Sequence, residues 1–473
     1  MLIEQAWAAL VGEVSGGDTR PARVSPAGPN IEIAGQQVPN LVCAYPLQDL
    51  ALACVSVALL AASSLEEQRG RGPARPVRVD RAHVAAAFRS ERLFVGSDRS
   101  LLGTLSRFWR VADGWVRTQA NAPWHAAALL RAVGVQPESD DSAVLIRAVE
   151  DALAGMSGEQ AQERIFAAGG IAGAMRSVAS WRDHPQGQAV AREPLIGHEV
   201  LDGARPRPHE AADLPARGLR VLDLTRVIAG PNCTKYLGAL GADVLRLDPP
   251  QYPDGGMTVG TFSDALLGKR SAFLGLDTDH GLALLHGLLD DADVVVCGYR
   301  PGALSRFGLG PEDLARRHPG LVVVYLSAWG HSGPWAERRG FDSVVQSPTG
   351  ISTGLSAGRD KPVVAPCAFL DYGTGYLAAA AALDGVRRQM ESGGTHIRRV
   401  SLARTAAWLT SSVDLVTTAP VAEAEDASPW MIDLTWGGKP VKVVTPVGQL
   451  GDSSLSWPEP DGAYGEARPE WKR

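Results

Sequence analysis

One carboxylate in this chain stands where it can do chemistry. Asp371 follows the apolar run Cys367 to Leu370 and precedes Gly373 and Gly375, which open an Ala- and Leu-rich run typical of a buried helix. At a helix N-terminus, the helix dipole and the free N–H groups favour an ionised carboxylate. Beside glycines, which leave room for a substrate, an ionised carboxylate is a candidate nucleophile. The same pattern also fits an Asp that only caps a core helix.

Other reactive residue types form no comparable pattern. The five cysteines are scattered and none belongs to a C-x-x-C pair, so neither a zinc site nor a disulfide framework is predicted. His125 and His184 have no partners at motif spacing, and we interpret both as structural or exposed. The G-x-G-x-x-G fingerprint of dinucleotide-binding proteins is absent after the strand predicted at 220–225.

The elements that must position Asp371 alternate between strand and helix. Residues 218–248 read as a strand, a helix and a second strand, and further strands are predicted at 272–276, 293–297 and 321–326. This alternation predicts an α/β fold with an open parallel, Rossmann-like sheet. Ligands of such sheets bind at the carboxyl ends of the strands, where the loops are Thr225 to Pro231, Gly298 to Gly302 and Ser327 to Gly333.

A smaller α/β region is predicted between residues 100 and 200. Phe108 to Thr118 reads as a hairpin with its turn at Asp113-Gly114, and helical patterns follow at 122–133, 141–154 and 157–167. Residues 201–217 are polar and Pro-rich, which predicts a linker. Residues 411–473 have little pattern and read as an extended tail with one strand near 439–447.

The Asp371 segment has an earlier counterpart in the chain. CAFLDYGTGYLAAAAAL, then ESGGTH, then IRRVSLARTAAWL matches CAYPLQDLALACVSVALL, then EEQRGRG, then VRVDRAHVAAAF. We interpret this as an internal duplication. The first copy has Asp49 near the place of Asp371 but lacks the D-x-G-T-G pattern, so we expect it to be structural at this site.

Composition limits the class of protein. The 473 residues are 45% hydrophobic and 21% charged, which is typical of a soluble globular protein. A net charge of −6 argues against nucleic acid and anionic membranes as partners. The N-terminus has no signal-peptide pattern, and the longest apolar run, Leu50 to Ser63, is too short to span a bilayer. We expect a cytoplasmic protein with no membrane partner.

With these residues in view, the chain resembles the class III CoA-transferases, the CaiB/BaiF family. The resemblance rests on ordered motifs: GLRVLDLTRVIAGPNCTKYLGALGADVLRLDPP, GKRSAFLGLD, YRPGALSRFGLG, VVVYLSAWGHSGPWAERRGFDSVVQSPTG and the Asp371 stretch. The N-terminal half resembles the family's middle and late regions, out of order. The chain is therefore similar to a partly duplicated and rearranged member of this family.

The resemblance implies a division of the chain. Residues 1–200 would be a degenerate family copy that includes the small domain at about 70–200, with 201–217 as the linker. Residues 218–410 would be the Rossmann-like CoA-binding and catalytic domain, and 411–473 the extended tail. Family members form interlocked dimers, so the resemblance also implies a homodimer.

The resemblance implies a CoA-transferase that moves CoA between an acyl-CoA and a carboxylic acid. Asp371 would be the catalytic nucleophile, passing through an aspartyl anhydride and an aspartyl-CoA thioester, with no metal and no bound cofactor. CoA and acyl-CoA would be substrates, with a carboxylate as acceptor. The residues carried over as CoA-binding are Val227, Ile228, Lys269, Arg270, Arg306 and Arg339.

Some positions depart from the family pattern and leave alternatives open. Cys297-Gly298-Tyr299 replaces the usual Glu-Asn-Phe, and Pro249 replaces a charged residue. These departures suit a degenerate homologue that binds CoA esters or acts as a scaffold. An α-methylacyl-CoA racemase is disfavoured, because racemases of this superfamily carry a His where this chain has Phe341. Asp342 matches an acidic position near the family's active site or is a turn Asp.

Overall fold

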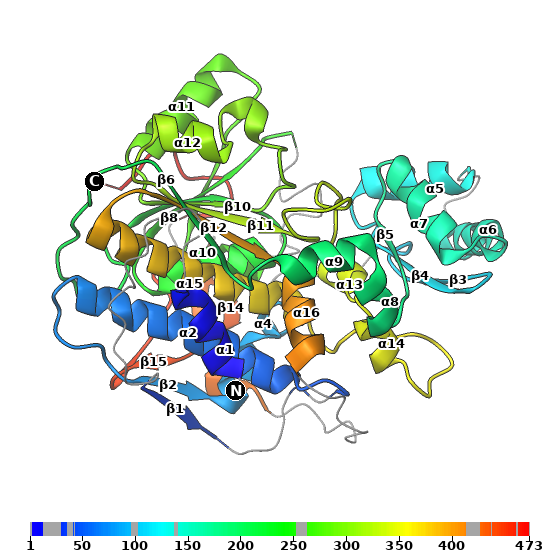
Figure 1. The fold of residues 1–473 in the computed structure, drawn as a ribbon, viewed down its shortest axis with the longest axis horizontal. Helices are drawn as coiled ribbons and strands as arrows, with labels where there is room; N and C mark the ends of the chain where they lie inside the picture. Colours follow the sequence, from blue (N-terminus) through cyan, green and yellow to red (C-terminus); the bar gives the residue numbers. More distant parts are fainter. Residues whose placement is uncertain are drawn as a thin grey trace.

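A seven-stranded sheet lies at the centre of the molecule (Figure 1). The computed structural model describes residues 2–12, 30–35, 41, 43–95, 103–136, 141–251, 263–412, 426–436, 438–459 and 462–472. The strand order is β6-β12-β11-β10-β7-β8-β9. Six strands are parallel and β6 pairs antiparallel with β12. Their bounds are β6 Gly197–Leu201, β7 Arg220–Leu224, β8 Asp243–Asp248, β9 Arg270–Phe273, β10 Val294–Cys297, β11 Val322–Ser327 and β12 Thr395–Ser401. The predicted open, mostly parallel α/β sheet is confirmed.

Helices cover both faces of this sheet because alternate strand residues point to opposite sides. Val294 and Val296 pack into the core that contains α10 (Ala229–Ala239) and α15 (Phe369–Ser392). Val295 packs into a second core with α11 (Asp279–Asp290) and α12 (Pro311–Arg317). Figure 1 shows α11 and α12 on one side of the strands and α15 on the other.

The two longest helices, α2 (Leu47–Gln68) and α15, pack against each other. The run Ala378 to Ala382 on α15 is fully buried, and such small side chains let helix backbones approach closely. By length and composition α2 could cross a membrane, and it is longer than the predicted apolar run, but 89% of its most apolar window is buried inside the fold. Its apolar surface is therefore core surface.

The N-terminal half and the tail share a four-stranded sheet in the order β1-β2-β15-β16. β2 pairs parallel with β1 and antiparallel with β15. The N-terminal elements are α1 Leu2–Val11, β1 Ile31–Ala34, β2 Val77–Asp80, α3 Arg81–Ala87 and α4 Ser90–Leu93. The tail elements are β13 Met431–Trp436, β14 Lys439–Val444, β15 Gln449–Leu450 and β16 Ser453–Ser454. The strand predicted near 439–447 is confirmed as β14.

The smaller α/β region forms a unit beside the main sheet, which we call the small unit. Its sheet has the order β3-β4-β5, and the hairpin predicted over Phe108 to Thr118 is confirmed as the β3–β4 pair. The bounds are β3 Phe108–Val111, β4 Gly114–Thr118, α5 Pro123–Val133, α6 Ser142–Ala154, α7 Gly158–Ala167 and β5 Ala172–Ala174. Helices α8 (Val178–Asp183) and α9 (Pro185–Arg192) then lead to β6 in the main sheet.

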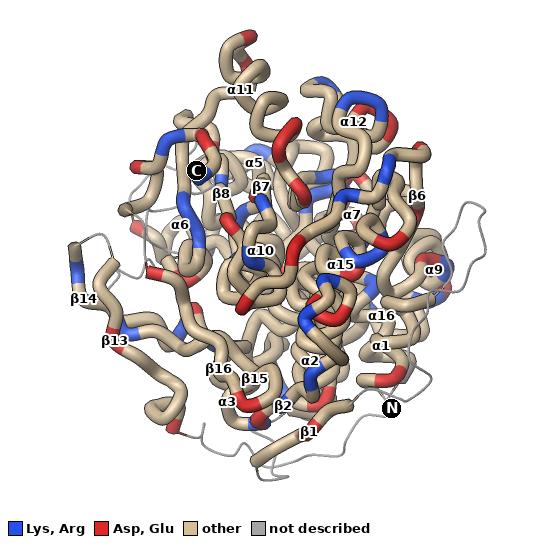
Figure 2. Tube along the Cα trace, turned by 90° about the vertical axis from the view of Figure 1, so that its left-hand side faces the viewer, with Lys and Arg blue, Asp and Glu red and all other residues tan. Residues whose placement is uncertain are grey.

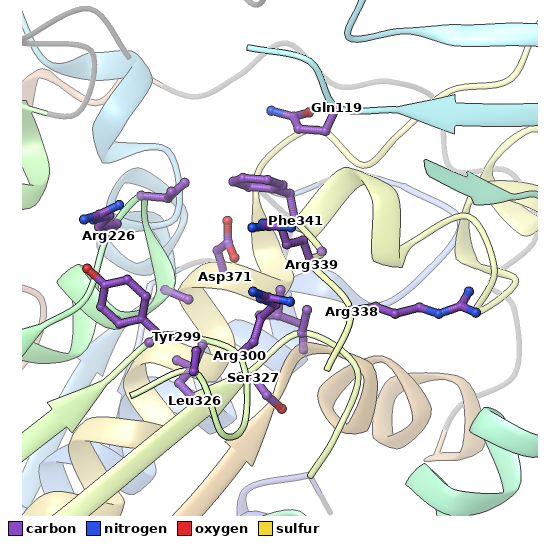
Figure 3. Close-up of a pocket in the computed structure, with 18 of the residues that line it drawn as sticks. Gln119, Arg226, Tyr299, Arg300, Leu326, Ser327, Arg338, Arg339, Phe341 and Asp371 are labelled. Atoms are coloured by element: carbon purple, nitrogen blue, oxygen red, sulfur yellow. The ribbon is translucent and has the colours of Figure 1, made fainter. Parts of the chain in front are cut away.

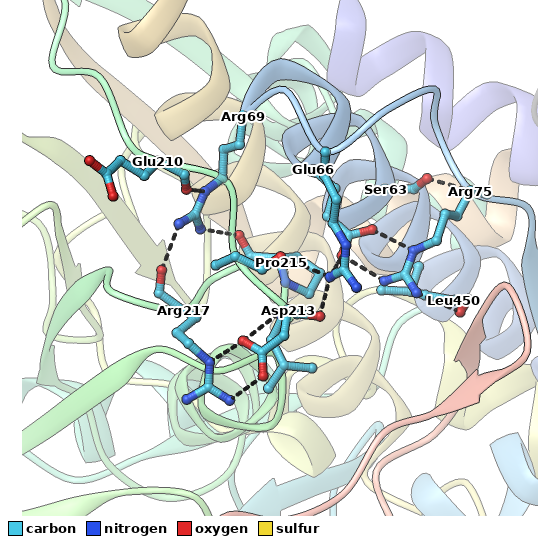
Figure 4. A network of polar contacts seen from close by, with 12 residues as sticks. Ser63, Glu66, Arg69, Arg75, Glu210, Asp213, Pro215, Arg217 and Leu450 are labelled. Atoms are coloured by element: carbon cyan, nitrogen blue, oxygen red, sulfur yellow. Dashed lines mark hydrogen bonds and ion pairs between the residues drawn. The ribbon is translucent and has the colours of Figure 1, made fainter.

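The predicted linker lies along the end of α2. No helix or strand is assigned to residues 202–219. Arg69 donates hydrogen bonds to the carbonyl oxygens of Glu210, Pro215 and Arg217 at 2.7, 2.7 and 2.8 Å (Figure 4). This segment is therefore anchored to the N-terminal half. Charged residues of both signs are interspersed along the outer elements (Figure 2).

Candidate active site

Asp371 is the third residue of α15, and the N-cap position belongs to Ala368. The interpretation of Asp371 as the helix cap is therefore wrong. Its side chain lines a cavity of about 490 Å³, a size typical of small-ligand sites. No donor among the described residues contacts its carboxylate, although the residue is only 6% exposed. Figure 3 shows this carboxylate near the middle of the cavity. The acid is open to a ligand rather than enclosed by apolar packing.

The helix is capped by a second acid, Asp342. Its Oδ2 accepts the backbone N–H groups of Leu370 and Asp371 at 2.8 and 3.2 Å. Its Oδ1 accepts from the amide of Gln346, whose own oxygen accepts from the Ala365 N–H at 2.9 Å. Asp342 thus fixes the first turn of α15, and with it the position of Asp371.

Burial raises the pKa of both acids. It raises the pKa of Asp342 to about 6. Burial, and then the charges of Asp342 and Glu91, raise the pKa of Asp371 well above its usual value. Desolvation and the like charges of Asp342 and Glu91 therefore oppose the ionised form that the helix terminus was expected to favour.

The third acid, Glu91, comes from the N-terminal half. It follows the first residue of α4, and the Tyr372 hydroxyl donates to its carboxylate at 2.6 Å. Burial raises the pKa of Glu91 as well. No motif in the sequence connected residue 91 with the Asp371 segment.

The glycines near Asp371 serve packing rather than substrate access. A Cβ on Gly375 would lie 2.5 Å from the carbonyl oxygen of Ala229, and one on Gly373 would lie 3.4 Å from the Cys54 sulfur. Gly375 therefore lets α10 approach α15, whereas a Cβ on Gly373 would make only an ordinary contact with α2. The expectation that they leave room for a substrate is wrong.

The cavity lies at the carboxyl ends of β7, β10 and β11, as the sequence predicts. The lining residues from these three loops include Arg226, Val227, Gly298, Tyr299, Arg300, Leu326, Ser327 and Ala328. The neighbouring parallel strands bring these loops together at one edge of the sheet.

Three arginines bring positive charge to the cavity. Arg226 lies 3.5 Å from Asp248, and its guanidinium lies 5.1 Å from the centre of the Tyr299 ring. Arg300 and Arg339 are exposed and line the cavity. Figure 3 shows Arg226, Arg300 and Arg339 around Asp371, while the Arg338 guanidinium points away. Of the three, only Arg339 was predicted.

Two predicted residues lie in the loop after β7. Val227 lines the cavity and has a φ of +73°, a strained backbone conformation for a β-branched residue. Ile228, at the N-cap position of α10, lines a neighbouring small cavity with Glu91 and Tyr372. The loop therefore holds Val227 at the main cavity and Ile228 behind it.

The structure places Lys269 and Arg270 elsewhere. The Lys269 ammonium is fully buried, 2.8 Å from Asp223, and burial lowers its pKa to about 8. Arg270 pairs with both oxygens of Asp243 at 2.9 Å and donates to the carbonyl oxygen of Glu470. Their prediction as CoA-phosphate partners is corrected: neither lines the Asp371 cavity, and both are held by structural acids.

Arg306 does not line the cavity either. It is exposed in a 3₁₀ turn (Ser305–Phe307), with its guanidinium 4.5 Å from the centre of the Phe307 ring. The preceding residues Leu304 and Ser305 line a second cavity of about 130 Å³, which shares Tyr299, Arg300 and Pro301 with the first. Arg306 is therefore next to the continuation of the site.

The small unit forms the remaining wall. The segment that joins β4 to α5 contributes Gln119, Asn121 and Ala122, and the first turn of α5 contributes Trp124 and His125. His125, interpreted from the sequence as structural or exposed, is 6% exposed and lies edge-to-face on Phe341 with ring centres 6.1 Å apart. This wall and Asp371 belong to the same chain, so no second copy is needed to bring them together.

The described residues contain no group of three or more His, Cys, Asp or Glu side chains arranged to hold a metal ion. The cavity is mostly apolar, contains an open carboxylate and is surrounded by arginines at the strand ends of an α/β sheet. Such a site is suited to a phosphate-bearing organic ligand.

Comparison with known proteins finds a family that part of the chain resembles. Residues 217–429 match the model of CoA-transferase family III. The matched range contains the predicted catalytic domain, 218–410. This match agrees with the resemblance to class III CoA-transferases that the ordered motifs carry.

Several named relatives resemble part of the chain. An acetyl-coenzyme A transferase of Hypoxylon pulicicidum is 34% identical over 239 residues, which are 49% of this chain and 36% of that protein. Human succinyl-CoA:glutarate CoA-transferase is 33% identical over 206 residues, 42% of this chain and 47% of that protein. The chain thus spans half or less of the length of these relatives.

Among solved structures, a CaiB/BaiF family protein from Brucella suis is 26% identical, with 48% of this chain and 65% of that chain covered and a TM-score of 0.39.

Proposed function

We propose that this protein is a CoA-transferase that moves CoA between an acyl-CoA and a carboxylic acid, with Asp371 as nucleophile. The observation that carries the proposal is the open Asp371 carboxylate in a cavity walled by the three strand-end loops. Acyl transfer between a carboxylate and a thiolate needs one unhindered carboxylate oxygen and no redox chemistry.

The reaction proceeds in balanced acyl transfers. The ionised Asp371 carboxylate attacks the thioester carbonyl, so that a C–O bond forms, the C–S bond breaks and the CoA thiolate leaves. The thiolate then attacks the Asp371 carbonyl of this mixed anhydride, which gives an aspartyl-CoA thioester and releases the first acid. The acceptor carboxylate repeats both steps in reverse order and leaves as its CoA thioester.

Asp342 and the arginines have distinct parts in this scheme. Asp342 holds the first turn of α15 and so fixes the attacking oxygen. Arg226, Arg300 and Arg339 are the proposed phosphate partners, because guanidinium groups bind phosphate oxygens in pairs. CoA then continues over Tyr299 and Arg300 toward the second cavity, next to Arg306. The backbone of Val227 and Ile228, in the loop after β7, is proposed to line the CoA site.

Trapping of the intermediate tests the proposal. The protein is incubated with acyl-CoA esters and then with hydroxylamine, which converts an aspartyl anhydride or thioester into a hydroxamate, and the modified residue is found by peptide mass spectrometry. The adduct is expected on Asp371 and is absent from Asp371→Asn. Asp49→Asn is the matched control, because Asp49 occupies the corresponding place in the first copy and its carboxylate is mostly exposed.

Exchange of CoA is measured on the same variants. Loss of exchange in Asp371→Asn, with exchange intact in Asp49→Asn, supports the proposal. Calorimetric binding of CoA with no exchange and no adduct across a broad set of acids refutes it in favour of a non-catalytic CoA-ester-binding protein. Wash-in of deuterium next to the thioester without exchange refutes it in favour of a racemase.

A further inference from the structure

Two polar side chains on the small unit's wall have no partner. Gln119 is 7% exposed and its amide forms no hydrogen bond with any described residue. His125 is 6% exposed and its Nε2 has no hydrogen-bond partner. Figure 3 shows Gln119 beyond Phe341 at the edge of the cavity, across from the strand-end loops. Both residues line the cavity that contains Asp371.

The segment that carries them is firmly held. The Ala120 N–H donates to Ser106 Oγ at 2.7 Å, and Asn121 Oδ1 accepts from the Gly103 N–H at 3.0 Å and from Ser106 Oγ. The neighbouring groups are thus satisfied by the fold, whereas Gln119 and His125 are not. Buried polar groups without partners are costly, and at a ligand cavity the ligand is the expected partner.

The charge of this wall defines the chemistry of its ligand. Residues 119–125, QANAPWH, contain no Lys, Arg, Asp or Glu. Burial, and then the charge of Arg339, lower the pKa of His125 to about 4, so its imidazole is neutral at physiological pH. A neutral amide and a neutral imidazole each offer a donor and an acceptor, which suits a group that both donates and accepts.

We propose that Gln119 and His125 recognise a hydroxyl group on the acyl chain, so that the carboxylate substrates are hydroxy acids. This inference rests on the proposed CoA-transferase function. An alkyl acid leaves His125 Nε2 buried without a partner and offers the Gln119 amide none, which disfavours its binding. The second carboxylate of a dicarboxylate only accepts hydrogen bonds, whereas a hydroxyl both donates and accepts.

A matched set of four-carbon acids tests this inference. CoA exchange is measured with butyrate, 2-hydroxybutyrate, 3-hydroxybutyrate and succinate as acceptors. One of the hydroxy acids is expected to exceed butyrate and succinate in kcat/KM by about 10- to 100-fold. Gln119→Leu and His125→Phe are each expected to reduce this preference at least fivefold. Gln136→Leu, an exposed position on the small unit, is the matched control and keeps the preference.

Thermal stability separates recognition from a structural role. Because His125 Nε2 has no partner, His125→Phe keeps the ring packing on Phe341 and is expected not to lower Tm. A lower Tm together with an unchanged substrate preference would mean that His125 is structural.

Binding to Asp371→Asn distinguishes failure of this inference from failure of the proposed function. The CoA esters of 2-hydroxybutyrate and 3-hydroxybutyrate are each compared with butyryl-CoA in calorimetry. One of the two is expected to bind Asp371→Asn at least tenfold more tightly than butyryl-CoA does. Exchange that is equal for all four acids, or greatest for butyrate or succinate, overturns the hydroxyl-recognition proposal and leaves the transferase function intact. The absence of exchange with every acid overturns the transferase function. Hydroxyl recognition is then tested by binding alone, and equal affinity for the hydroxylated CoA esters and butyryl-CoA overturns it.

Discussion

The substitution Asp342→Asn tests the role of the acid that caps α15. Asp342 accepts two backbone N–H groups and the Gln346 amide, and no cation balances its charge in these contacts. Asn resembles the protonated acid, with one acceptor and one donor in place of two acceptors. The variant is therefore expected to gain stability relative to wild type as pH rises.

The magnitude follows from the pKa of Asp342, which burial raises from 3.8 to about 6. A carboxyl with a raised pKa in the folded state makes the protein less stable as pH rises through that value, because the folded state must release a proton that it binds more tightly. The free energy of unfolding of the wild type is expected to fall by about 3 kcal/mol in total, and roughly half of this loss falls between pH 5 and pH 8. Asn at this position removes this loss.

Asp384→Asn on the same helix is the matched control and has the opposite sign. Although burial raises the pKa of Asp384, the guanidinium groups of Arg398, Arg387 and Arg388 hold it below its usual value. Its ionised form therefore stabilises the fold by a constant amount above about pH 4, and Asp384→Asn is expected to be less stable than wild type by the same amount at every pH between 5 and 8.

Urea unfolding of wild type and both variants between pH 5 and pH 8 measures these differences. A difference from wild type that rises with pH for Asp342→Asn, beside a constant loss for Asp384→Asn, supports the reasoning. A difference between Asp342→Asn and wild type that does not change with pH would refute it. In a CoA-exchange assay, the acid limb of kcat/KM is expected to move to lower pH in Asp342→Asn, because Asp371 then loses a neighbouring negative charge.

Three further predictions concern the cavity and the helices behind it. Lys269→Met leaves Asp223 without its buried partner and is expected to cost about 3–5 kcal/mol in unfolding free energy; an unchanged urea midpoint would contradict the buried pair. Arg300→Ala is expected to raise KM for acyl-CoA at least tenfold with Tm unchanged, and equal KM values would remove Arg300 from the proposed site. Gly375→Ala forces a Cβ to 2.5 Å from a carbonyl oxygen of α10 and is expected to lower the free energy of unfolding by about 1–3 kcal/mol. Gly287→Ala, which has open space on α11, is expected to raise it by about 0.5–1 kcal/mol. Similar Tm changes for the two variants would contradict this packing.

The sequence was a good guide where local pattern determines structure. Continuous apolar runs such as Val294 to Cys297 are typical of strands buried on both faces, and their alternation with helices predicted the sheet and the edge at which the cavity lies. The bounds were less certain: β9 begins at Arg270 rather than residue 272, since its pairing with β8, not its own apolar residues, sets its start.

The candidate site was harder to predict because side chains find their partners in three dimensions. A lysine beside a glycine looks the same in sequence whether it faces a ligand or, like Lys269, a buried Asp223. Gln119 and Glu91 reach the Asp371 region from the N-terminal half, and no spacing in the chain encodes that proximity. The one available signal for Arg226 and Arg300 was their place in the loops that follow β7 and β10.

The exchange of strands between the two halves has a consequence for how the protein melts. β6 from the N-terminal half completes the main sheet against β12, and β15 from the tail pairs with β2. If either half unfolds, the sheet in the other half loses a paired strand. The whole chain is therefore expected to unfold as one cooperative unit. Calorimetry should record a single heat-absorption peak, and two resolved peaks would mean that the halves come apart before either denatures.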